Sequence, residues 1–218
     1  MNARNARPLL VAALIAGTSY YATHWAPVAP AADAVWKGAG VGLLALWAAA
    51  RARSTDGWLL AAALALGAAG DVLLETHGMT VGAIAFLAGH LVAATLYLRN
   101  RSGPAWQAGL IAIAVAVTAF LLPADRGAAP GIALYAVGLG LMFGAAAVSR
   151  FPVAVALGAA LFVFSDLLIF GRMGPLAGSA LPGLLIWPTY FAGQALIAVG
   201  VVTALAKEQA REDLHHRL

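Results

Sequence analysis

Residues 57–75 read GWLLAAALALGAAGDVLLE, and this stretch decides the class of fold. Before its last residue it holds one charged side chain, Asp71, which lies near one end. An α-helix needs about 20 predominantly apolar residues to cross the hydrocarbon core of a bilayer. The stretch is therefore typical of a transmembrane helix that carries a single internal acid.

The remainder of the chain has the same apolar character. Of its 218 residues, 62% are hydrophobic and 10% are charged, and the mean hydropathy is +0.87. Soluble domains carry about 25% charged residues, so most of this surface must face something other than water. At about 20 residues per span, the length leaves room for seven or eight helices. We expect an all-α polytopic membrane protein in which residues 1–218 form a single transmembrane domain.

The apolar runs predict about eight transmembrane helices joined by short loops. Pro104 and Pro152 suit the first turns of two helices, and residues 171–182 are rich in Gly and Pro, as loops are. The charged segment 207–218 is expected to form a short cytoplasmic tail. The predicted spans are roughly 8–23, 34–50, 57–75, 79–98, 104–122, 130–149, 152–170 and 182–206.

The first span has a second interpretation. Arg4 and Arg7 precede an apolar run, and Ala29-Pro30-Ala31 follows it, which is also the pattern of a cleaved signal peptide. A retained first helix is favoured by the internal repeat described below.

Lysine and arginine are distributed unevenly between the two sides of the predicted bundle. With eight spans, Arg126, Arg172 and Lys37 fall on one side. The other side holds ten basic residues: Arg4, Arg7, Arg51, Arg53, Arg99, Arg101, Arg150, Lys207, Arg211 and Arg217. Because basic loops stay in the cytoplasm, we predict a multi-pass protein of the cell membrane with both termini cytoplasmic. These residues occur singly or in pairs, so no nucleic-acid partner is expected.

The two halves of the chain carry similar motifs. FLAGH at 86–90 in the fourth span resembles YFAGQ at 190–194 in the eighth. The Gly-rich span before each motif contains an acid, Asp71 in the first half and Asp166 in the second. The offset of four helices predicts a parallel 4+4 repeat about an axis along the membrane normal. Chance similarity among Ala/Gly/Leu-rich helices is the alternative. The predicted halves are residues 8–98 and 104–206.

Ionisable groups at membrane depth are costly and mark candidate functional sites. Asp71 and Asp166 are the clearest, and we expect them to be the catalytic pair. His90 lies in the fourth span, while Tyr190 and Gln194 share one face of the eighth because they are four residues apart. We expect all five side chains to meet in an outer-half cavity, where the last three bind or orient substrate. Simple packing is the alternative for His90, and an interfacial position is the alternative for Tyr190.

Two further charges lie near the predicted outer surface. Lys37 is one turn inside the second span, where it either snorkels outward or contacts a substrate phosphate. Glu75 lies one turn beyond Asp71 and is expected at a solvated loop end; the alternative is that it belongs to the same outer-half cavity.

Motifs that would indicate other chemistries are missing from the sequence. The chain has no Cys, which excludes thiol nucleophiles and Cys metal sites. It has no Gly-x-Ser-x-Gly elbow, no His-Glu-x-x-His zinc motif and no Gly-rich phosphate loop. No metal and no cofactor are expected. The available chemistry is acid–base work by carboxylates, helped by an imidazole, a phenol and an amide.

These motifs, in order and spacing, resemble those of the YhhN-like lysoplasmalogenase family. The resemblance covers most of the chain. One departure is Leu91-Val92-Ala93 after His90, where an aromatic residue is expected. The matching motifs are Lys37, Gly70-Asp71, Phe86-Leu87-Ala88-Gly89-His90, Phe162-Val163-Phe164-Ser165-Asp166, and Pro188-Thr189-Tyr190 followed by Gln194.

The resemblance implies an eight-helix membrane hydrolase that cleaves the vinyl ether bond of lysoplasmalogens. Its substrate would be a lysophospholipid, and its products a fatty aldehyde and a glycerophospho-base. Such a reaction passes through an oxocarbenium ion and needs one carboxylic acid and one carboxylate, as in glycosidases. Asp71 and Asp166 match the family's acidic positions. We favour Asp166 as the acid, because Phe162 and Phe164 predict a drier setting, while Glu75 leaves Asp71 wetter.

Two other classes of function fit the same residues. A proton-coupled transporter of small molecules or lipids also uses parallel repeats with acids near their interface. It needs a site that both sides can reach, whereas these acids lie toward one side. A non-catalytic lipid-binding protein would tolerate the loss of either aspartate. The sequence leaves the head-group preference and the oligomeric state open.

Overall fold

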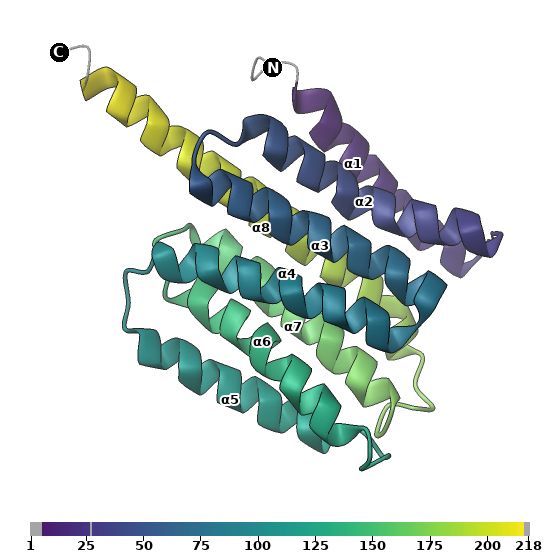
Figure 1. Ribbon diagram of the computed structural model, residues 1–218. Coiled ribbons are helices and arrows are strands. Elements are labelled where there is room, and N and C mark those ends of the chain that lie inside the picture. Colours follow the sequence, from purple (N-terminus) through teal and green to yellow (C-terminus); the bar gives the residue numbers. More distant parts are fainter. Residues whose placement is uncertain (1–5, 27, 216–218) are drawn as a thin grey trace.

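The computed structural model describes residues 6–26 and 28–215, and over these residues it contains helices and no β-strands (Figure 1). The eight predicted spans are confirmed as α-helices in the predicted order. Arg4 and Arg217, which entered the topology prediction, lie outside the described residues. The elements are α1 (Arg7–Tyr20), a 3-10 helix η2 (Tyr21–His24), α2 (Pro30–Arg51), α3 (Thr55–His77), α4 (Met79–Arg99), α5 (Ala105–Leu121), α6 (Ala129–Ala147), α7 (Val153–Arg172) and α8 (Leu181–His215).

Local sequence explains where several helices begin and end. The side chain of Ser54 caps the start of α3 by accepting a hydrogen bond from the backbone of Gly57 at 3.3 Å. Pro104 and Pro152 are the residues immediately before the first turns of α5 and α7, one position earlier than predicted. Gly78 separates α3 from α4 with a φ of 86°, a conformation that favours glycine.

The last helix is longer than the predicted span. α8 continues from residue 206 to His215, where a tail was expected. The segment 207–214 contains neither Gly nor Pro, and Lys, Glu, Gln, Ala, Arg and Leu all favour the helix. An ion pair between Arg150 and Glu208 ties this extension to the α6–α7 connection.

The lengths and surfaces of the helices fit a membrane-spanning bundle. Five of the described helices, namely α3, α4, α6, α7 and α8, are long and apolar enough to cross a bilayer. The apolar helix α5 is shorter, with 17 residues. Val35, Leu134 and Val153 are each more than two-thirds exposed on the outside of the bundle. Soluble proteins rarely expose broad apolar surfaces, whereas bilayer hydrocarbon accommodates them.

Six helices form a closed ring, and two helices pack outside it. Around the ring, α2 packs on α3, α3 on α4, α4 on α6, α6 on α7, α7 on α8, and α8 on α2. Outside the ring, α1 packs on α2 and α8, and α5 packs on α6 and α7. Figure 1 shows α1 and α5 at opposite edges of the bundle. Each half of the chain thus supplies three ring helices and one outer helix.

The predicted 4+4 repeat stays a prediction. The contacts between the two halves are similar: α2 of the first half packs on α8, and α6 of the second half packs on α4. The halves differ in their internal packing, because α2 packs along α3 much more extensively than α6 packs on α7.

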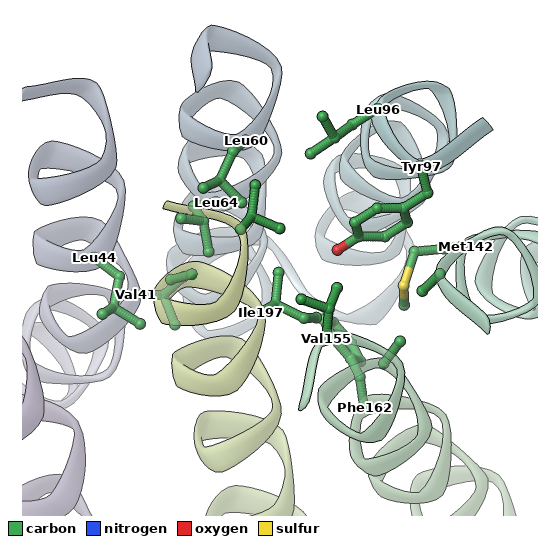
Figure 2. Packing of buried hydrophobic residues seen from close by; sticks show 14 of the residues in the cluster. Val41, Leu44, Leu60, Leu64, Leu96, Tyr97, Met142, Val155, Phe162 and Ile197 are labelled. Atoms are coloured by element: carbon green, nitrogen blue, oxygen red, sulfur yellow. The ribbon is translucent and has the colours of Figure 1, made fainter. Parts of the chain in front are cut away.

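Small residues allow the helices to approach closely, as in other membrane proteins. Gly140 and Gly144 of α6 lie against the backbone of α5, and a Cβ at either would come within 3 Å of Ala112 or Ala108. The half of the ring nearer the termini is filled by apolar side chains, among them Leu60 (Figure 2).

Candidate functional site

The first candidate acid, Asp71, lies in the second half of α3 and is 2% exposed. Its Oδ2 atom accepts a hydrogen bond from the Tyr190 hydroxyl of α8 at 2.8 Å. One turn further along α8, Gln194 donates its amide N–H to the Tyr190 oxygen at 3.5 Å. Gln194, Tyr190 and Asp71 therefore form one hydrogen-bonded row, which we call the Asp71 arm.

The second candidate acid, Asp166, lies in α7 and is 6% exposed. Its Oδ2 atom accepts a hydrogen bond from the Tyr135 hydroxyl of α6 at 2.7 Å. The same hydroxyl oxygen is 3.0 Å from Nε2 of His90 in α4. Because Tyr135 gives its only proton to Asp166, it accepts from His90, so Nε2 is the protonated ring nitrogen. His90, Tyr135 and Asp166 form the Asp166 arm.

The ring of Phe162 lies between the two arms. Its centroid is 4.9 Å from the rings of both Tyr190 and His90, and both contacts are edge-to-face. Phe86 packs edge-to-face on Phe162 and on Tyr190 from the α4 side. This aromatic packing holds the polar side chains of both arms in place.

Both arms end at one large cavity of about 780 Å³, which lies within the size range of small-molecule sites. Asp71, Tyr190, Asp166 and Tyr135 line it, together with residues of α1, η2, α2 and α4. Its lining includes residues of η2 and of the start of α4, which belong to the end of the bundle opposite the start of α1 and the end of α8. Figure 1 shows where these helices begin and end.

The lining of the cavity changes from charged to apolar. At one part of it, Lys37 donates to Glu75 across a 2.5 Å contact, and Arg172 also lines the wall. Another part lies between α4 and α6, where Ile84 and Leu134 line the cavity while also being among the exposed apolar side chains. The cavity can therefore receive a molecule with both a charged group and a hydrocarbon chain.

A proline in α8 helps to position Tyr190. Pro188 has no N–H, so the carbonyl oxygen of Leu184 lacks its usual helix partner. The Tyr21 hydroxyl donates to this oxygen at 3.1 Å, and the Ser165 hydroxyl donates to another carbonyl of the same turns at 3.0 Å. These bonds tie the start of α8 to η2 and α7, and Tyr190 follows two residues after the proline.

A smaller cavity of about 20 Å³ lies behind the arms. His90 and Gln194 line it, and neither residue lines the large cavity. Within the described residues, no group of three or more His, Asp or Glu side chains is arranged to hold a metal ion.

A comparison with models of known protein families identifies the family of this chain. A model of the YhhN family matches residues 32–201. The chain belongs to the YhhN family. The matched segment runs from α2 into α8 and contains every residue of both arms. No curated protein and no solved structure matches the chain.

In this YhhN chain, the predicted site residues separate into three groups. Asp71, Asp166 and Tyr190 meet at the large cavity. Lys37 lines the same cavity and is paired with Glu75, an exposed residue near the end of α3. The expected single cavity is wrong for His90 and Gln194, because each faces the smaller space behind a tyrosine.

The environments expected for the two acids need correction. Phe164 is 45% exposed, since two residues along a helix place it on a different face from Asp166. Asp71 is as buried as Asp166, because Tyr190 covers it. The sequence argument that made Asp166 the drier acid therefore does not hold.

Tyr135 is the site residue that sequence reasoning missed. A single tyrosine in an Ala/Gly/Leu-rich span was visible in the sequence, but its partners lie 31 and 45 positions away.

Proposed function

We propose that this protein is a membrane-embedded hydrolase that cleaves the vinyl ether bond of alkenyl lysophospholipids. The observation that carries the proposal is the pair of arms: two buried aspartates, each held by a tyrosine hydroxyl, line one cavity with charged and apolar parts. Membership of the YhhN family is compatible with this activity. The products are a fatty aldehyde and a glycerophospho-base.

The two carboxyl groups have complementary tasks in the proposed reaction. One aspartic acid donates its proton to the vinyl carbon β to the ether oxygen, which leaves an oxocarbenium ion. The other, ionised aspartate accepts a proton from water as the water oxygen attacks this cation. The hemiacetal then collapses: its hydroxyl proton returns to the first carboxylate, and the second carboxylic acid protonates the departing glycerol oxygen. Both groups end in their starting states, as in glycosidases.

The cavity fits a single-chain lipid in one orientation. The hydrocarbon chain occupies the part between α4 and α6, where Ile84 and Leu134 also border the bilayer. The phosphate lies near Lys37 and Arg172, where it competes with Glu75 for the lysine. The vinyl ether bond then lies between these two parts, where the aspartates line the wall.

The packing in the half of the bundle nearer the start of α1 and the end of α8 favours a hydrolase over a transporter. A carrier needs a route from the site to the opposite side. On that side of the arms, buried apolar residues including Leu60, Leu64 and Met142 surround the cavity of about 20 Å³, which is too small to pass a lipid (Figure 2). The large cavity has its charged residues on the side away from the termini.

The test is aldehyde release by the purified protein in nanodiscs. The matched substrates are a 1-alkenyl and a 1-alkyl lysophospholipid of equal chain length, and only the first should be cleaved. In D₂O the aldehyde should carry one deuterium on the carbon next to the carbonyl, because the acid delivers a solvent-exchanged proton there. Absence of aldehyde, or equal cleavage of both lipids, would refute the proposal.

A further inference from the structure

The cavity of about 20 Å³ behind the arms is small but is lined by several polar side chains. Three polar side chains line it: His90 and Tyr97 of α4, and Gln194 of α8. The rest of the lining is largely apolar, with Phe162 on one side.

Tyr97 is the only buried polar side chain without a hydrogen-bond partner in the described part of the chain. The residue is fully buried, and its ring packs edge-to-face on Phe151. Figure 2 shows its hydroxyl pointing toward the space between the helices that carry Leu64 and Ile197. A buried hydroxyl without a partner destabilises a protein, so a partner is expected here.

The size of the cavity selects the partner. A buried water needs at least about 10–15 Å³ of such space and makes about three hydrogen bonds. A volume of about 20 Å³ holds one water molecule and nothing larger.

The hydrogen-bond capacities of the three side chains match one water molecule. Tyr97 has a free donor. His90 donates from Nε2 to Tyr135, so Nδ1 carries no proton and can accept. Gln194 donates from Nε2 to Tyr190, so its amide oxygen can accept. A water that accepts from Tyr97 and donates to the other two satisfies all three groups.

We propose that this cavity is a water-binding site that joins the two arms. The water connects Gln194 of the Asp71 arm to His90 of the Asp166 arm. It also holds His90 in the tautomer that keeps the Tyr135 proton on Asp166. Tyr97 is thereby a positioning residue for both arms. The proposed site rests on the lining and volume of the cavity and on the hydrogen-bonding capacities of its polar side chains, and it does not depend on the hydrolase proposal.

The first test uses the sign of a stability change. Tyr97→Phe removes only the hydroxyl oxygen. If the water is bound, the variant loses one hydrogen bond and its thermal midpoint in detergent falls by about 2–4 °C. If the cavity is dry, the variant removes an unsatisfied group and its midpoint rises. An unchanged or raised midpoint contradicts the proposal.

The second test measures the His90 ring nitrogens by ¹⁵N NMR on histidine-labelled protein. The chain has five histidines, and the His90 signals are assigned by their loss in His90→Gln. In the unmodified protein Nδ1 should show the shift of a hydrogen-bonded acceptor. Both Tyr97→Phe and Ala93→Val, which fills the cavity, should move this signal toward that of a free acceptor. Ala85→Val, on the same helix but outside the cavity, is the matched control.

A third measurement decides independently of any variant. A crystal or cryo-EM map that resolves ordered waters should show one density peak within hydrogen-bond distance of Tyr97, His90 and Gln194. A map that shows other buried waters but none in this cavity overturns the proposal, whatever the protein's activity.

Discussion

At the residue scale, the two aspartates share one pattern of contacts. In both, Oδ2 accepts from a tyrosine hydroxyl, and the residue lines the large cavity. A hydrogen bond from a neutral phenol restricts the rotation of a carboxyl group without neutralising it with a counter-charge. Asp71 and Asp166 can therefore each gain or lose a proton in a fixed geometry, which general acid–base catalysis requires.

The first prediction concerns the carboxyl groups themselves. Asp71→Asn and Asp166→Asn should each lower turnover at least about 10²-fold, since general acid–base groups contribute 10²–10⁴-fold. Folding should survive, because asparagine keeps the size and removes a charge that is costly in a membrane. The control is Asp125→Asn, an exposed loop acid outside both cavities. A folded Asn variant with near-full aldehyde release would rule out the two-carboxylate mechanism.

The second prediction concerns the tyrosines. Tyr135→Phe and Tyr190→Phe should each lower kcat by about 10- to 100-fold, the range expected for a hydrogen bond to a charged group, with little change in KM. Because Tyr135 acts through Asp166, adding Tyr135→Phe to Asp166→Asn should cause little further loss. Steady-state aldehyde release from the two single variants and the double variant measures this. Multiplied losses in the double variant would mean that Tyr135 contacts substrate directly.

The sequence located the two aspartates and Tyr190 but not Tyr135, for a physical reason. A carboxylate inside an apolar run is rare because it is costly, so Asp71 and Asp166 are visible from composition alone. Tyr135 is not, because a tyrosine in a membrane helix has many roles and its own depends on how α6 packs on α7. Contacts of that range follow from the fold, and no local pattern encodes them.

At the element scale, α8 has a defined break in its backbone hydrogen bonds. Pro188 frees the Leu184 carbonyl, and the Tyr21 hydroxyl satisfies it. A bilayer offers no water for such a group, so another part of the protein must supply the donor.

The sequence predicted the helices well because their apolar length is a local property. The sequence argument missed the continuation of α8 past residue 206, because the charged residues from Lys207 onward were interpreted as a tail outside the helix.

The third prediction tests whether the Tyr21 hydroxyl replaces the backbone donor that Pro188 lacks. Pro188→Ala restores an N–H for the Leu184 carbonyl, so it should raise the thermal midpoint while lowering activity through displacement of Tyr190. Tyr21→Phe alone should lower the midpoint, because it leaves the carbonyl without a donor. In the Pro188→Ala background, Tyr21→Phe should have a clearly smaller effect on the midpoint. Equal effects of Tyr21→Phe in both backgrounds would show that Tyr21 stabilises the protein by other contacts.

At the scale of the whole molecule, the two ends of the six-helix ring differ in structure. The large cavity lies at one end of the ring, and the charged extension of α8 lies at the other. At that other end the buried Asn100 donates to Asp56 at 2.8 Å and accepts from Arg150 at 2.9 Å. Arg150 in turn pairs with Glu208 of α8. One end of the bundle is thus held by a polar network, and the other end carries the cavity.

The fourth prediction is the orientation of the protein in the membrane. We expect the end that carries the cavity to face outward and both termini to be cytoplasmic. The chain has no cysteine, so single introduced cysteines can be labelled without background. Gly178→Cys in the exposed α7–α8 loop should react with a membrane-impermeant maleimide in intact cells, because this loop is at the cavity end. Asp213→Cys, exposed near the end of α8, should react only after permeabilisation. The reverse pattern would place the site on the cytoplasmic side, and the substrate would then have to reach it from the inner leaflet.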